Sequence, residues 1–273
     1  MVKKIVLTFL FVTLSGGIFL NCNAGENKTV ILATTTSVQD TGLLDMLADA
    51  FQKKTGYTLK AIAVGSGQAF KMARDGNADI LWVHSPDDEK KFVDEGYGTD
   101  RTTIMHNDFV ILGPENGPAD IKGDKDVRDA FRKIAVSKAV FVSRGDNSGT
   151  HKKEKRIWEI AGVLPDKGSY IEVGQGMAAT LRVADEKKGY ILCDRSTYLS
   201  LKNTIGLTIL CEGDPSLVNY YSLILVNFVK FPKVNKEGAK ALFDFLLSEY
   251  SKNIIENFGR NKFGKQLFFW DHK

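Results

Sequence analysis

In the stretch Val30-Ile31-Leu32-Ala33-Thr34-Thr35-Thr36-Ser37, four apolar residues are followed directly by four hydroxyl residues. The apolar half is typical of a buried strand, and the leucines and phenylalanine at helical spacing in residues 41–54 predict a helix next. Further strands are predicted over residues 59–64 and 80–83, each followed by a helix. This order predicts an α/β fold with parallel strands and right-handed crossovers.

A second α/β series follows the chain break Gly113-Pro114-Glu115-Asn116-Gly117-Pro118. The strand predicted over residues 221–226 would return to the first series. We therefore expect lobe I over residues 25–112 and 219–273, and lobe II over residues 113–218. Ligands of open α/β sheets bind beyond the carboxyl ends of the strands, so a ligand is expected in the cleft between the lobes.

Composition excludes several classes of protein. The 273 residues are 43% hydrophobic and 26% charged, with only 25 Gly and 6 Pro, which rules out collagen-like, low-complexity and polytopic membrane chains. The formal net charge is +4, and the densest cationic run, over residues 151–156, includes an acid. We therefore expect no nucleic-acid partner.

The first residues are predicted to be a targeting sequence and not part of the fold. Lys3 and Lys4 precede an apolar run over residues 5–14, as in a secretory signal peptide over residues 1–24, so we expect a periplasmic or other extracytoplasmic protein. Cleavage after Ala24 would release a soluble form. The alternative is lipid anchoring through Cys22, since Phe19-Leu20-Asn21-Cys22 is a poor lipobox.

Two further cysteines, Cys193 and Cys211, each end an apolar run. In an oxidising compartment they form one disulfide if their strands lie side by side, and otherwise stay two separate buried thiols. Neither their spacing nor their neighbours suggest a metal site.

Three hydroxyl-rich turns stand at predicted strand-to-helix transitions. They are Thr34-Thr35-Thr36-Ser37, Val64-Gly65-Ser66-Gly67-Gln68 and Ser143-Arg144-Gly145-Asp146-Asn147-Ser148-Gly149-Thr150. Unpaired N–H groups and partial positive charge at helix N-termini suit an anion. Helix capping explains each turn, taken alone, as well as anion binding does. An ion pair with Asp146 at the surface would explain the presence of Arg144. Taken together, the turns predict a site for a small oxyanion that uses many uncharged donors and at most one arginine.

Together with Asp194-Arg195-Ser196-Thr197-Tyr198-Leu199 and Glu212-Gly213-Asp214-Pro215, these turns resemble the tungstate-binding proteins of bacterial ABC importers, the TupA type. The resemblance implies a type II periplasmic-binding-protein fold with two lobes that closes on tungstate, with molybdate as a competitor. It implies delivery to a membrane ABC permease and its ATPase, no cofactor, no bare metal cation and a monomer. The ligand-binding residues that it implies are Thr35, Thr36, Ser37, Ser66, Arg144, Ser148, Thr150 and, through its backbone N–H, Met177.

Two alternatives remain open from the sequence. The turn around Arg144 also resembles the arginine loop of phosphate-binding proteins of the same fold, but that family places an aspartate where this chain reads Trp82-Val83-His84-Ser85-Pro86. A secreted serine hydrolase would need a base paired with a serine. No Gly-x-Ser-x-Gly elbow is present in the sequence, so we expect a protein that is not an enzyme.

Overall fold

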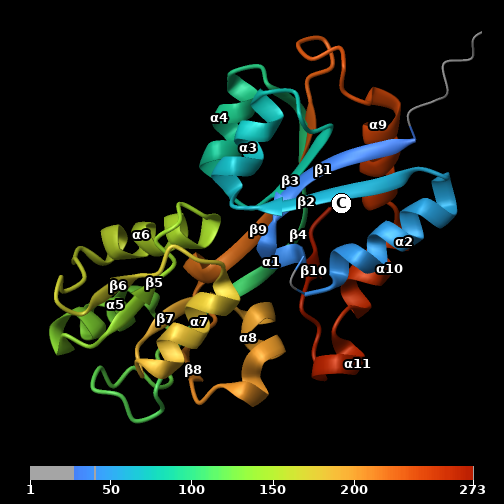
Figure 1. The fold of residues 1–273 in the computed structure, drawn as a ribbon. Helices are drawn as coiled ribbons and strands as arrows, with labels where there is room; N and C mark the ends of the chain where they lie inside the picture. Colours follow the sequence, from blue (N-terminus) through green and yellow to red (C-terminus); the bar gives the residue numbers. More distant parts are fainter. Residues whose placement is uncertain (1–27, 40, 273) are drawn as a thin grey trace, which may run out of the picture.

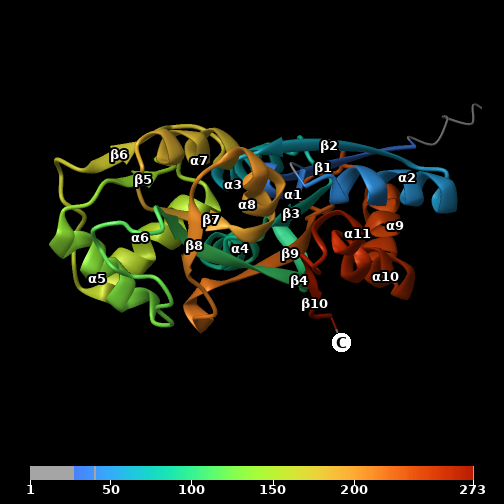
Figure 2. The ribbon, with the colours of Figure 1, turned by 90° about the horizontal axis from the view of Figure 1, so that it is seen from below.

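The computed structural model describes residues 28–39 and 41–272. The predicted signal peptide and the predicted lipid attachment at Cys22 lie outside these residues. Two lobes lie side by side, joined by two long neighbouring strands, β4 (Gly98–Gly113) and β9 (Val218–Val226) (Figure 1). Figure 2, at a right angle to this view, shows the same two lobes end to end. The two-lobed α/β architecture expected from the sequence is therefore confirmed.

Lobe I is built on a mixed sheet with the strand order β10-β4-β9-β3-β1-β2. Its other strands are β1 (Thr29–Thr35), β2 (Thr58–Val64), β3 (Ile80–Val83) and β10 (Phe269–Trp270). Strand β1 pairs in parallel with both β2 and β3, as the alternation of strands and helices predicted. Strand β9 runs antiparallel to β3 and β4, which returns the chain from lobe II to lobe I.

Amphipathic helices cover this sheet. They are α1 (Thr36–Gln39), α2 (Leu43–Thr55), α3 (Ser66–Arg74), α4 (Pro86–Asp94), α9 (Lys236–Leu246), α10 (Glu249–Asn257) and α11 (Arg260–Phe263). Helix α2 shows the pattern: Leu43, Leu47 and Phe51 lie on one buried face in the core that also contains Val30 and Leu32 of β1. Gly56, at a φ of 75°, ends that helix in the left-handed conformation that glycine adopts without strain.

Lobe II contains the shorter strands β5 (Phe141–Ser143), β6 (Tyr170–Glu172), β7 (Ile191–Asp194) and β8 (Thr208–Cys211). Its helices are α5 (Val127–Ser137), α6 (Gly149–Ala161), α7 (Met177–Glu186) and α8 (Arg195–Leu201). An aromatic cluster holds α5, α6 and β5 together. The ring centroid of Trp158 lies 4.4 Å from that of Phe131 and 5.1 Å from that of Phe141. This packing joins the last turns of α6 to α5 and to the first residue of β5.

Strand β4 belongs to both lobes. It pairs with β9 as far as Asp108, opposite Val218, and from Phe109 onward it pairs with β7 and β8. The cores divide at the same place, since Met105 packs in a lobe I core and Phe109 in a lobe II core. This change of partners comes a few residues before the boundary predicted between residues 112 and 113. The predicted lobe boundaries themselves stay a prediction.

Some elements were not expected from the sequence, and β4 and α8 are two of them. Strand β4 begins at Gly98, although its continuous apolar run covers only residues 109–112. Residues 99–103 of its first half are all half-exposed or exposed and consist of Thr and charged side chains, so this half shows no continuous apolar run. Helix α8 was missed because its sequence reads as a polar turn; Asp194 caps it by accepting a hydrogen bond from the Thr197 N–H.

The structure decides between the two alternatives for Cys193 and Cys211. Both are free, buried thiols. Cys193 lies opposite Val110 and Cys211 opposite Ile111, and consecutive residues of β4 point to opposite faces of the sheet. The two sulfurs therefore lie in different cores, and the disulfide alternative was wrong. Within residues 28–39 and 41–272, no helix is long and apolar enough to span a bilayer.

Candidate oxyanion site between the lobes

Two of the three hydroxyl turns meet at the carboxyl edge of the lobe I sheet. Thr35 ends β1 opposite Val64, the last residue of β2, and Ser66 opens α3 directly beyond it. Thr35 and Ser66 are both buried, and Thr36, the first residue of α1, is half-buried. The side chain of Ser37 lies outside what the structure describes.

Ser66 has an unusual environment for a buried serine. Its side chain is 0% exposed, and its Oγ has no hydrogen-bond partner among the described residues. Buried hydroxyls are generally hydrogen-bonded, because leaving one unpaired costs free energy. Gly65 occupies the N-cap position of α3 and offers no side-chain cap. The Ser66 hydroxyl therefore does not cap its own helix, and no described residue hydrogen-bonds to it.

The third turn lies in lobe II and is tied to the start of α7. The backbone oxygen of Arg144 accepts a hydrogen bond from the Gly174 N–H at 2.7 Å, and its Nε donates to the Gln175 oxygen at 3.3 Å. The Arg144 side chain is 95% buried and forms an ion pair with Asp146, so the pair that the alternative expected is present but does not lie at the surface. Burial alone would raise the pKa of Asp146, but hydrogen bonds from Ser148 and the charge of Arg144 lower it.

Ser148 and Thr150, at the start of α6, have different partners. Ser148 is the N-cap, and its hydroxyl accepts a hydrogen bond from the His151 N–H at 3.3 Å. Capping therefore accounts for Ser148, whereas Thr150 is 2% exposed and its Oγ1 has no partner in the described part of the chain. The side chain of Met177 is buried in the lobe II core with Leu181, so only its backbone can face a ligand.

The lobes touch where α6 meets the tip of β3. A Cβ built on Gly149 would lie 2.8 Å from His84 Cε1 and 3.0 Å from the His84 backbone oxygen, so the absence of a side chain permits this approach. Nearby, Lys152 of α6 forms an ion pair with Asp88 of α4. These contacts bring the start of α6, which carries Thr150, against the segment of lobe I that follows β3.

A buried chain of polar side chains crosses the strands that join the lobes. His84 Nδ1 lies 2.9 Å from Asn219 Oδ1, the Asn219 amide donates to Asn107 at 2.7 Å, and the Asn107 amide donates to Ser196 at 3.5 Å. Ser196 in turn donates to Asp194. Burial lowers the pKa of His84 to about 4, so its ring is neutral near pH 7. Sequence reasoning missed this chain, since its members are isolated polar residues in strands and turns.

Thr197 is a second feature that sequence reasoning missed. It is 3% exposed, and its Oγ1 also lacks a hydrogen-bond partner among the residues described. The signal was present, because Ser196-Thr197 follow β7 as the other hydroxyl turns follow their strands. Asp194, which caps this helix through Oδ1, has an equally buried Oδ2 without a partner in the described residues.

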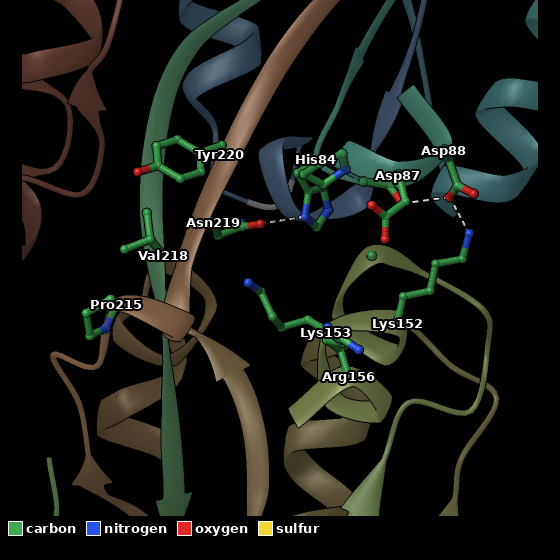
Figure 3. Close-up of a pocket in the computed structure, with 13 residues that line it drawn as sticks. His84, Asp87, Asp88, Lys152, Lys153, Arg156, Pro215, Val218, Asn219 and Tyr220 are labelled. Carbon is green, nitrogen blue, oxygen red and sulfur yellow. Dashed lines mark hydrogen bonds and ion pairs between the residues drawn. The ribbon is translucent and has the colours of Figure 1, made fainter. Parts of the chain in front are cut away.

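The arrangement suits an oxyanion better than a cation. Its polar groups are mostly hydroxyls and helix N-termini, and its one arginine is already balanced by Asp146. In residues 28–39 and 41–272, no cluster of three or more His, Cys, Asp or Glu residues could hold a metal ion. A cavity of about 290 Å³ adjoins the site through His84 and Gly149 without including the predicted hydroxyl groups (Figure 3).

The fold and the cleft define a class of two-lobed binding proteins, and a family model described as the PBP superfamily domain matches residues 23–250. A curated relative is the tungstate-binding protein TupA of Peptoclostridium acidaminophilum, 46% identical over 242 residues, which cover 88% of this chain and 85% of that protein.

Two solved structures extend the likeness. The tungstate-binding protein TupA from Desulfovibrio alaskensis G20 is 46% identical with a TM-score of 0.78, covering 90% of this chain and 99% of that one. The tungstate ABC transporter structure from Geobacter sulfurreducens is 41% identical with a TM-score of 0.79, covering 86% of this chain and 100% of that one. The chain belongs to the TupA family of the PBP superfamily, a family of solute-binding proteins and not an enzyme class.

Proposed function

We propose that this protein captures tungstate outside the cytoplasm, with molybdate as a competitor, and delivers it to a membrane ABC permease driven by its ATPase. The relatives named as tungstate-binding proteins support this function at 41–46% identity over nearly the whole chain. The observation that carries it at the level of residues is the pair of buried, unpartnered hydroxyls, Ser66 from lobe I and Thr150 from lobe II.

The proposed contacts divide between the lobes. Thr35, Thr36, Ser37 and Ser66 would bind from lobe I, and Arg144, Ser148, Thr150 and the Met177 backbone from lobe II. The partners of Ser148 make its hydroxyl the weakest of these candidates, since it already caps α6. Binding needs no cofactor and no catalytic step, and a monomer suffices because both walls of the cleft come from one chain.

Location follows from the same proposal. A binding protein of an importer works outside the cytoplasm, after removal of residues 1–24 or after lipid attachment at Cys22. The described residues, 28–39 and 41–272, all follow Cys22 and Ala24 in the sequence.

Phosphate is the alternative ligand. Phosphate near neutral pH carries a proton and gains from a carboxylate acceptor, whereas tungstate and molybdate have no proton to donate. The tip of β3 offers the neutral His84 instead of an acid. The buried, unpartnered Asp194 Oδ2 is the feature of this cleft that would suit phosphate. A hydrolase finds less support, because His106 is paired with Asp271 and His151 Nδ1 accepts from the Asn147 N–H.

Isothermal titration of the purified protein with tungstate, molybdate, sulfate and phosphate tests the function. We expect one tungstate per chain, displaced by molybdate, with no heat from phosphate. Binding of phosphate alone would contradict the proposal and make Asp194 the residue to study. If none of the anions produced heat, the proposal would be wrong and the hydrolase alternative would have to be tested.

A further inference from the structure

The cavity beside the hydroxyl groups has no assigned role. It lies between the first turns of α6 in lobe II and the segment of lobe I that begins at His84, and β9 closes its side at Asn219 and Tyr220 (Figure 3). It adjoins the candidate site through Gly149 and His84, which touch across the cleft. An anion that enters the cleft from this side therefore passes through the cavity before it reaches the buried hydroxyls.

Three cationic side chains line this cavity, and they differ in their partners. Lys152 is paired with Asp88, and Arg156 is paired with Glu159 at 2.5 Å. Lys153 has no ion pair or hydrogen bond with any residue that the structure describes. Arg144 is also paired with its own acid, so Lys153 is the cation of this cavity that has no ion pair among the described residues.

The surroundings of Lys153 favour an anionic partner. Its side chain is half-buried, and Figure 3 shows its amine directed from α6 into the space toward β9. Burial lowers the pKa of Lys153, while the negative charge of Asp214 acts in the opposite direction. Asp87 is the acid that lines the cavity without an ion pair among the described residues. Holding an ammonium partly out of water costs free energy, which an incoming dianion would offset.

We propose that this cavity is the entrance to the oxyanion site and that Lys153 is its capture residue, which draws the dianion into the cleft before the lobes close. This inference rests on the proposed function and assigns to Lys153 a role in the rate of capture, distinct from the hydroxyl contacts that hold the bound anion. Attraction between opposite charges in a cleft raises association rates, and salt weakens it.

The test is the rate of tungstate association, measured by stopped-flow tryptophan fluorescence at several salt concentrations, with affinity measured by titration calorimetry. The variants are Lys153→Gln, Lys153→Arg and Lys155→Gln. Lys155→Gln is the matched control, because this substitution removes the same charge from the same helix at an exposed position outside this cavity. We expect Lys153→Gln to slow association about threefold to tenfold at low salt, with a smaller difference at high salt. Lys153→Arg should keep most of the rate, and dissociation should change less than twofold.

Several outcomes would overturn the proposal. If Lys153→Gln associates as fast as the wild type, with the same salt dependence, Lys153 is not the capture residue. An equal loss in Lys155→Gln would show an effect of net charge alone. An unchanged association rate with faster dissociation would make Lys153 a direct ligand. Wild-type protein that binds neither tungstate nor molybdate would overturn the proposed function as well, and so the two failures are distinguishable.

Discussion

At the scale of single residues, the hydroxyls at the cleft differ in what they already bind. The Ser148 hydroxyl accepts a hydrogen bond from the backbone of α6, whereas the hydroxyls of Ser66 and Thr150 are buried without partners among the described residues. All three belong to the same kind of strand-to-helix turn, so their sequence context does not separate them. The partner of each hydroxyl, and not its residue type, decides whether it is available for an anion.

This difference gives a prediction for Ser66→Ala and Thr150→Val. Neither substitution removes a hydrogen bond within the described protein, so the melting temperature should stay nearly constant, while each lost contact should weaken tungstate binding about threefold to tenfold. Ser148→Ala is the contrasting variant, and it should lower the free energy of unfolding by about 1 kcal/mol through loss of the cap. Calorimetric titration and thermal unfolding measure the two effects. Equal destabilisation in all three variants would favour capping as the role of every turn.

At the scale of elements, α6 links the parts of the site. Its start carries Thr150, its first turns line the cavity, and Trp158 near its other end packs in the core of lobe II. Its contact with the tip of β3 passes through Gly149. A rigid helix held at one end by core packing can therefore present its N-terminus to the other lobe.

Gly149→Ala tests this contact. The added Cβ would lie 3.0 Å from the His84 backbone oxygen, which can move less easily than a side chain, so α6 and β3 should be held apart. We expect tungstate affinity to fall at least tenfold. Stability without ligand should be nearly unchanged, because alanine at this position does not require a left-handed backbone. Calorimetric titration gives the affinity. Wild-type affinity in this variant would show that the close approach is not needed for binding.

At the scale of the whole molecule, two buried titratable groups act on the stability in opposite directions. Glu154 of α6 accepts hydrogen bonds from Trp158 and Tyr170, and burial raises its pKa to about 7. Burial lowers the pKa of His84 to about 4. As pH rises from 4.5 to 7, native Glu154 holds its proton more tightly than the unfolded chain does, so the free energy of unfolding falls. Between pH 4 and 6.5 the neutral native His84 has the opposite effect.

Comparison with Glu154→Gln separates the two contributions. The wild type should lose stability relative to this variant as pH rises from 5 to 8, by an amount on the order of 3 kcal/mol for a shift of this size. The His84 contribution is common to both proteins and cancels. Urea unfolding at pH 5, 6, 7 and 8 measures the difference. Parallel pH profiles would show that Glu154 is ionised at the same pH in the folded and unfolded chains.

The α/β alternation, the parallel order of the first strands and the family to which the chain belongs could all be predicted from the sequence. These properties depend on local patterns, such as apolar runs of strand length and hydroxyl residues where a strand turns into a helix. For the same reason, the turns at Thr35, Ser66 and Arg144 could be found without a structure. Their role as ligands stays a prediction.

Only the tertiary structure decided which groups have partners. It placed Cys193 and Cys211 in separate cores, paired Arg144 with Asp146 and left the side-chain oxygens of Ser66, Thr150 and Thr197 without hydrogen bonds among the described residues. It also joined His84 to Asn219 and Asn107 across the strands between the lobes, and continued β4 from one lobe into the other. These contacts join residues that are far apart in the sequence. Which of them meet depends on how the sheets and helices pack, and local sequence patterns do not predict that packing.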